Sequence, residues 1–163
     1  MITHTLARVL LLFALTILSS LQTSFAQSDS QLEAARAASQ LAQPPKIVLI
    51  YFGSRSCAEC ANWEGTQLPL LQQWDRFKNN VEFYKIAKQR ISPVPGCTWW
   101  STPTMPYCEA VLHYYDTRRI KKGGTPMSAL LINNVVVDGG LGTRRLSKER
   151  IGRFLDVALA PAS

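Results

Sequence analysis

The feature that most constrains the fold is a continuous apolar run from Lys46 to Phe52, which ends at Gly53. The run reads KIVLIYF, contains several β-branched residues and shows no alternation of apolar and polar positions. Such a run is typical of a strand buried on both faces, as in sheets that helices cover on each side. The chain is therefore expected to adopt an α/β fold.

Shorter patterns predict the other strands. Residues 81–87 alternate apolar and polar side chains, and 127–132 form a second apolar run. A tight turn at Asn133-Asn134 returns the chain into an antiparallel strand at 135–137. Residues 139–142, which read GGLG, are expected to be a flexible connection. These strands predict a mixed sheet within an α/β sandwich.

Helices are expected between these strands. A capping-box pattern predicts that a short helix starts at Ser30. Residues 57–79 form a second helix, with a kink or break near Gly65 and Pro69. Ser147 caps a last helix that has one apolar face.

The segment 91–124 does not continue this alternation of strands and helices. It is predicted to be a small ordered insertion with one helix from Glu109 to Ile120. Its aromatic residues form either the small core of the insertion or a hydrophobic lip for partner chains. They are Trp99, Trp100, Tyr107, Tyr114 and Tyr115.

The first 26 residues resemble a cleavable secretory signal peptide, with one firm positive charge, a ten-residue apolar run and a small-x-Ala site ending at Ala26. The alternative is an uncleaved anchor, but ten residues rise only about 15 Å as a helix. Residues 27–45 then form an N-terminal helix and linker, and 46–160 form the main domain. An exported protein with this signal is expected in the periplasm.

The full chain carries 18 Lys and Arg against 11 Asp and Glu, a net charge of +7. No nucleic-acid motif accompanies this charge, so no nucleic-acid partner is expected.

All four cysteines lie beyond the signal segment, and Cys57-Ala58-Glu59-Cys60 carries the sharpest chemical signal. The motif follows a buried strand and starts a helix. Unpaired N–H groups and the helix dipole stabilise a thiolate there, which lowers the thiol pKa from about 8.5. Cys57 can then attack a disulfide, and Cys60, one turn on, can resolve the mixed intermediate.

Two other interpretations of this motif remain open. A CxxC pair can be half of a zinc site, but no second CxxC or HxxxH follows it. An inert structural disulfide is the other alternative, although such bonds rarely lie between a buried strand and a helix N-terminus.

The arrangement resembles the thioredoxin superfamily over roughly Lys46 to Leu159, interrupted by the insertion. The matching pieces are KIVLIYFGSRSCAEC, VEFYKIA, Gly124-Thr125-Pro126 before MSALLINN, and the last helix. The resemblance implies a thioredoxin-like fold, with a mixed central sheet flanked by helices and an insertion before the cis-proline loop. It also implies that Pro126 is cis and that Thr125 pairs with substrate, as in periplasmic thiol:disulfide interchange proteins.

The chain departs from thioredoxins proper at several positions. Ser56 replaces the Trp before the first Cys, and Ala58-Glu59 replaces Gly-Pro between the cysteines. Tyr51 stands where the family keeps a buried acid, and a helical proline is replaced near Gly65. Glu59 places a negative charge beside the thiolate, which weakly favours a reductase or isomerase over a strong oxidant.

Cys97 and Cys108 allow three interpretations. They form a structural disulfide in the insertion, a second redox pair that exchanges with Cys57 and Cys60, or a metal site with His113. We take the structural disulfide as the prediction, with no metal at either pair.

The sequence therefore predicts an exported thiol-disulfide oxidoreductase that reduces, forms or isomerises disulfides in periplasmic proteins. Cys57 and Cys60 carry the redox equivalents, so no cofactor is needed. Its expected partners are cysteine-containing protein substrates and a membrane or periplasmic redox partner. The alternatives are a thioredoxin-fold copper-handling or assembly protein and a redox-inactive partner-binding domain.

Overall fold

The computed structural model describes residues 29–88, 96–97, 100–121 and 123–161. The expected signal peptide and its cleavage site lie outside the described residues, as do Trp99 and much of the first half of the insertion.

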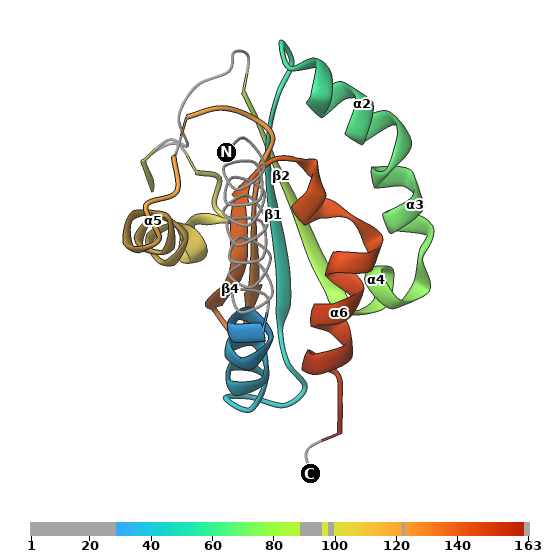
Figure 1. The fold of residues 1–163 in the computed structure, drawn as a ribbon, viewed down its shortest axis with the longest axis vertical. Helices are drawn as coiled ribbons and strands as arrows, with labels where there is room; N and C mark the ends of the chain where they lie inside the picture. Colours follow the sequence, from blue (N-terminus) through green and yellow to red (C-terminus); the bar gives the residue numbers. More distant parts are fainter. Residues whose placement is uncertain (1–28, 89–95, 98–99, 122, 162–163) are drawn as a thin grey trace, which may run out of the picture.

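A four-stranded mixed sheet forms the centre of the molecule (Figure 1). Its strands are β1 (Ile47–Ser54), β2 (Val81–Lys88), β3 (Met127–Ile132) and β4 (Val135–Leu141), in the order β2-β1-β3-β4. β1 runs parallel to β2 and antiparallel to β3, and β3 runs antiparallel to β4. Every residue of β1 is buried, which confirms the both-face burial expected from its sequence.

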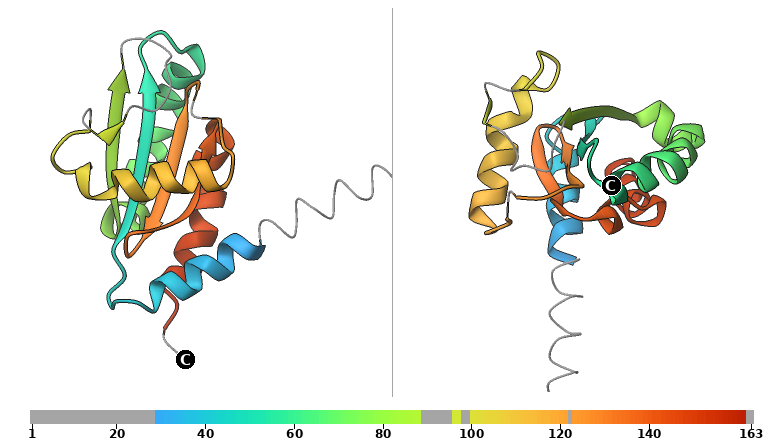
Figure 2. Two further views of the ribbon diagram at one scale, coloured as in Figure 1. Left: turned by 90° about the vertical axis from the view of Figure 1, so that its left-hand side faces the viewer. Right: turned by 90° about the horizontal axis from the view of Figure 1, so that it is seen from above.

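Helices cover both faces of this sheet (Figures 1 and 2). On one face lie α2 (Ala58–Thr66), α3 (Leu68–Gln73), α4 (Asp75–Asn80) and α6 (Lys148–Ala158). On the other face lie the short 3-10 helix η2 (Met105–Tyr107) and α5 (Cys108–Thr117). Each face of β1 therefore belongs to its own hydrophobic cluster, with Tyr51 in one and Phe52 in the other. The predicted α/β architecture with a mixed sheet is confirmed.

The segment expected as one broken helix is divided into three. α2 ends at Thr66 and α3 begins at Leu68 with Pro69 in its first turn, which confirms the predicted break. A second break, which was not predicted, falls at Trp74, whose backbone is extended. Trp74 lies under the ammonium of Lys148, which places α4 next to the start of α6.

The prediction of a flexible connection at 139–142 is wrong in part, because β4 continues to Leu141. Gly139 pairs with Ala129, and a Cβ at Gly139 would lie 2.9 Å from the carbonyl oxygen of Ser128. The glycine therefore marks a close approach of two strands and not a loop.

The aromatic residues of the insertion that the structure describes are buried, so the interpretation as an exposed lip is wrong for them. They are Trp100, Tyr107, Tyr114 and Tyr115. The Trp100 ring contacts Phe52 of β1 with centroids 5.3 Å apart, and the Tyr115 hydroxyl donates to the Ser128 carbonyl at 2.7 Å. These side chains are the core between α5 and the sheet. α5 ends earlier than the expected Ile120, and Arg119 adopts positive φ just after it.

A helical segment at residues 29–39 packs at the end of the sheet near the β3–β4 turn. The Asn133 side chain donates to the carbonyl oxygens of Ala38 and Ala42, which fixes this segment against the turn. Asn133 and Asn134 both have positive φ, as the predicted tight turn requires. Ser30 is already helical, so the capping box does not mark the start of this helix.

Candidate functional site

The Cys57–Cys60 pair lies where β1 passes into α2. After the turn at 55–56, Cys57 becomes the N-cap residue of α2, and its sulfur forms a disulfide with Cys60. The backbone N–H of Cys60 donates to the Cys57 sulfur at 3.1 Å. Cys57 is 4% exposed and Cys60 is fully buried. In a reduced pair, this N–H would stabilise a thiolate on Cys57, which is the more exposed residue of the two.

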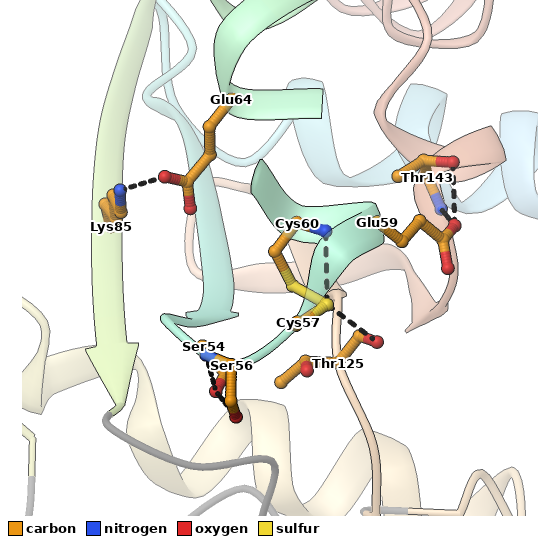
Figure 3. Close-up of a disulfide and its surroundings, with 9 residues drawn as sticks. All are labelled: Ser54, Ser56, Cys57, Glu59, Cys60, Glu64, Lys85, Thr125 and Thr143. Carbon is orange, nitrogen blue, oxygen red and sulfur yellow. Dashed lines mark hydrogen bonds and ion pairs between the residues drawn. A yellow bond between two sulfur atoms is a disulfide. The ribbon is translucent and has the colours of Figure 1, made fainter. Parts of the chain in front are cut away.

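The loop at Thr125-Pro126 lies directly against this pair (Figure 3). The Thr125–Pro126 peptide bond is cis, as predicted. The Cys57 sulfur lies 3.5 Å from the Thr125 carbonyl oxygen, and the Thr125 hydroxyl oxygen is buried without a hydrogen-bond partner among the described residues. The Gly142 N–H donates to the Pro126 carbonyl at 2.8 Å and ties this loop to the end of β4. The two segments that sequence analysis assigned to the site therefore meet.

Three polar side chains, those of Glu64, Lys85 and Tyr51, lie between α2 and the sheet. Glu64 is one helical turn after Cys60 and pairs with Lys85 of β2 at 2.5 Å. Within the described part of the chain, the Tyr51 hydroxyl is buried without a hydrogen-bond partner, and its ring lies against Trp63 with centroids 4.7 Å apart. A Cβ at Gly53 would lie 2.9 Å from both the Glu64 carboxylate and the Tyr51 hydroxyl, so only glycine leaves room for both.

The Tyr51 phenol stays protonated over the physiological range. Burial raises its pKa above the usual value near 10, and the neighbouring carboxylates of Glu64 and Glu59 raise it further. Tyr51 is therefore a neutral group at physiological pH, and the carboxylate that lies with it beside Gly53 is that of Glu64.

Glu59, between the two cysteines, contacts a segment far along the chain. Its Oε1 atom accepts from the Thr143 hydroxyl at 3.0 Å and from the Thr143 N–H at 3.3 Å. Thr143 begins the 3-10 helix η3 (Thr143–Leu146) after β4. Figure 3 shows the Glu59 side chain directed toward Thr143 and away from the Cys57 sulfur.

Cys97 and Cys108 form a second disulfide, at the start of α5. Cys108 is fully buried and belongs to the cluster between α5 and the sheet, whereas Cys57 and Cys60 belong to the cluster on the other face. The structure therefore does not bring the two pairs together. His113 is exposed on α5, and the described residues contain no group of three His, Cys, Asp or Glu side chains that could hold a metal.

Thr143 and Glu64 were not among the sequence-predicted site residues. Glu64 could have been found from its spacing, because a residue four positions after Cys60 lies on the same face of a helix. Thr143 gives no local signal, since its contact with Glu59 joins residues 84 apart.

In comparisons with known proteins, no protein-family model and no curated protein sequence matches this chain. Across the part of the chain that the structure describes, no helix is both long and apolar enough to cross a membrane.

Proposed function

We propose that the protein is an exported thiol-disulfide oxidoreductase of thioredoxin-like fold. One observation carries the proposal: a CxxC disulfide caps the N-terminus of α2 beside a cis-proline loop, with the Cys57 sulfur 3.5 Å from the Thr125 carbonyl oxygen. The strand order β2-β1-β3-β4 is compatible with this fold.

In the reductive direction, the Cys57 thiolate attacks one sulfur of a substrate disulfide. A mixed disulfide forms between Cys57 and the substrate, and the other substrate sulfur leaves as a thiolate that takes up a proton. The Cys60 thiol then loses its proton and attacks the Cys57 sulfur. This step closes the Cys57–Cys60 disulfide and releases the second substrate thiol, so two electrons have passed to the substrate. Oxidation of a substrate dithiol is the reverse sequence.

Thr125 and Pro126 are the proposed substrate-binding residues, because they border the Cys57 sulfur. Periplasmic proteins with cysteines are the proposed substrates, and a membrane or periplasmic redox partner restores the working state of the pair. Since the sulfurs themselves carry the electrons, the proposed reaction uses no cofactor.

Insulin reduction with dithiothreitol as the electron source tests the activity. The wild-type protein should accelerate precipitation of the insulin B chain, and Cys57→Ser should abolish the acceleration. Cys60→Ser should accumulate a mixed disulfide with insulin that mass spectrometry detects. Cys97→Ser combined with Cys108→Ser is the matched control, because it removes the other disulfide and leaves the CxxC pair.

Two results would argue against the proposal. A limiting dose of iodoacetamide that labels Cys60 before Cys57 in the reduced protein would reverse the assigned roles. Tight stoichiometric Cu(I) binding by the reduced protein, with no insulin reduction, would instead favour the copper-handling alternative.

A further inference from the structure

We propose that Thr143 is a positioning residue that holds the Glu59 carboxylate away from Cys57 and thereby keeps the Cys57 thiol reactive. Because Cys57 is the nucleophile of the proposed function, this proposal rests on that function and assigns part of its regulation to the loop after β4.

The first support is a continuous set of contacts around Cys57. Glu59 accepts two hydrogen bonds from Thr143, and the preceding residue, Gly142, donates to the Pro126 carbonyl. The residue before Pro126 is Thr125, whose carbonyl oxygen lies 3.5 Å from the Cys57 sulfur. The loop after β4 therefore contacts both the residue between the cysteines and the cis-proline loop.

The second support is the position of Glu59 in the first turn of α2. A carboxylate in a first turn can accept hydrogen bonds from the same free N–H groups that stabilise an anion at the N-cap. Here that anion would be the thiolate of reduced Cys57, whose sulfur accepts from the Cys60 N–H in the disulfide form. With its Oε1 atom bonded to Thr143, the Glu59 carboxylate is directed away from these groups.

The third support is the charge distribution around the site. The Glu64 charge is compensated by Lys85, and the Arg145 charge by Asp138. Arg55, in the turn before Cys57, and Arg144, next to Thr143, are exposed. Tyr51 is neutral at physiological pH because burial raises its pKa. Among the described residues, Glu59 is therefore the acidic group near Cys57 whose carboxylate accepts hydrogen bonds from neutral donors only.

The direction of the change in the Cys57 pKa follows from like-charge repulsion, because a nearby carboxylate disfavours the thiolate and raises the pKa of the thiol. Glu59→Gln should lower the Cys57 pKa by about 0.5 to 1 unit, as expected for one nearby exposed charge. Thr143→Val removes the hydroxyl donor and leaves only the longer backbone N–H contact to hold the Glu59 carboxylate, so the Cys57 pKa should rise by roughly 0.3 unit. A lower thiol pKa makes the disulfide more oxidising.

The test measures the Cys57 pKa from the pH dependence of its alkylation by iodoacetamide in the fully reduced protein, read by peptide mass. Thr143→Val should raise the pKa in the wild-type background and leave it unchanged in the Glu59→Gln background. Thr143→Ser, which keeps the hydroxyl, should behave as the wild type. Thr66→Val is the matched control, because the Thr66 hydroxyl donates to Asn62 within α2 and not to Glu59.

Two outcomes would overturn the proposal. One is an equal shift from Thr143→Val in both backgrounds, which would mean that Thr143 acts through the loop and not through Glu59. The other is an unchanged Cys57 pKa in Glu59→Gln. Insulin reduction is measured in parallel on the wild type. Absence of that activity contradicts the proposed function. The alkylation data test the role of Thr143 independently of the insulin result.

Discussion

Arg150 of α6 donates from Nε to the buried carboxylate of Asp138 in β4 at 2.6 Å. Asp138 also pairs with Arg145 and accepts from the Gln31 amide at 3.0 Å. The carboxylate is 4% exposed, so it joins β4, α6 and the helical segment at 29–39 at a single buried point. This network positions α6 against the edge of the sheet.

Asp138→Asn should therefore destabilise the protein by about 3 kcal/mol, because it leaves two guanidinium groups without their buried counter-charge. Urea unfolding of the oxidised protein measures the change. Asp156→Asn is the control, since Asp156 also pairs with an arginine, Arg76, but is 63% exposed. It should cost about 0.5 kcal/mol or less. Equal losses in the two variants would show that the Asp138 network contributes no more than a surface pair.

Two of the buried tyrosines, Tyr51 and Tyr115, differ in the hydrogen bonding of their hydroxyl groups, and a phenylalanine substitution at each tests this difference. The Tyr51 hydroxyl has no hydrogen-bond partner in the residues that the structure describes, whereas the Tyr115 hydroxyl donates to the Ser128 carbonyl at 2.7 Å. Tyr51→Phe should leave stability at pH 7 unchanged or raise it, because it removes an unsatisfied polar group. Tyr115→Phe should lower it by about 1 to 2 kcal/mol, since a carbonyl loses its donor. Urea unfolding at pH 7 distinguishes them, and a larger loss in Tyr51→Phe would contradict the assignment.

The same tyrosines predict a loss of stability at alkaline pH. Burial is the main cause that raises the pKa of both Tyr51 and Tyr115 in the folded protein, while in the unfolded chain both ionise near pH 10. Above pH 10 the unfolded state therefore binds fewer protons than the folded state, and the free energy of unfolding falls as pH rises. Unfolding between pH 8 and 11 should show a shallower decline in Tyr51→Phe. An identical decline in wild type and variant would mean that Tyr51 ionises normally.

The glycines in β4 and α2 should respond oppositely to alanine. A Cβ at Gly139 would lie 2.9 Å from the Ser128 carbonyl oxygen, so Gly139→Ala forces the strands apart and should cost about 2 kcal/mol. Gly65 is exposed in α2, and no neighbouring atom of the described residues lies within 4 Å of a Cβ placed there. Gly65→Ala should stabilise by about 0.5 to 1 kcal/mol through helix propensity. Thermal unfolding measures both, and a neutral Gly139→Ala would contradict the close strand approach.

The disulfide between Cys97 and Cys108 is predicted to contribute to stability and not to exchange. Replacing both residues by Ser should lower the free energy of unfolding by about 3 kcal/mol, because the unfolded chain regains the freedom of the closed loop. Insulin reduction, measured where the variant remains folded, should stay within about twofold of the wild type, since the CxxC pair lies on the other face of the sheet. Loss of the activity in the folded variant would instead support a redox relay through the insertion.

Much of the sheet could be predicted because its signals are local. The apolar run at Lys46 to Phe52 and the Asn133-Asn134 turn specify their own conformation within a few residues. The flexible connection predicted at Gly139 was wrong, because glycine occurs both in loops and at close contacts between strands. Only the position of Ser128 distinguishes the two cases. At the candidate site, Cys57 and Cys60 form a motif within four residues, whereas the cis bond before Pro126 was expected from the family resemblance and not from a local rule.

The missed contacts all join distant parts of the chain. Gln31 and Asp138 are 107 residues apart, and their pairing depends on where the N-terminal helix packs. No periodicity or cap predicts that placement. The same holds for Glu64 and Lys85, whose separation of 21 residues includes the helices α3 and α4.

The contact between Gln31 and Asp138 has a consequence for the extent of the domain. A chain that began at Lys46 would retain all four strands and both disulfides. It would lose Gln31 from the Asp138 network and would lose Ala35 and Ala38 from the hydrophobic cluster that also contains Leu146 and Ile151. The smallest autonomous folding unit is therefore expected to include the N-terminal helix, and proteolysis between Ser39 and Lys46 should release a fragment that unfolds more readily than the intact protein.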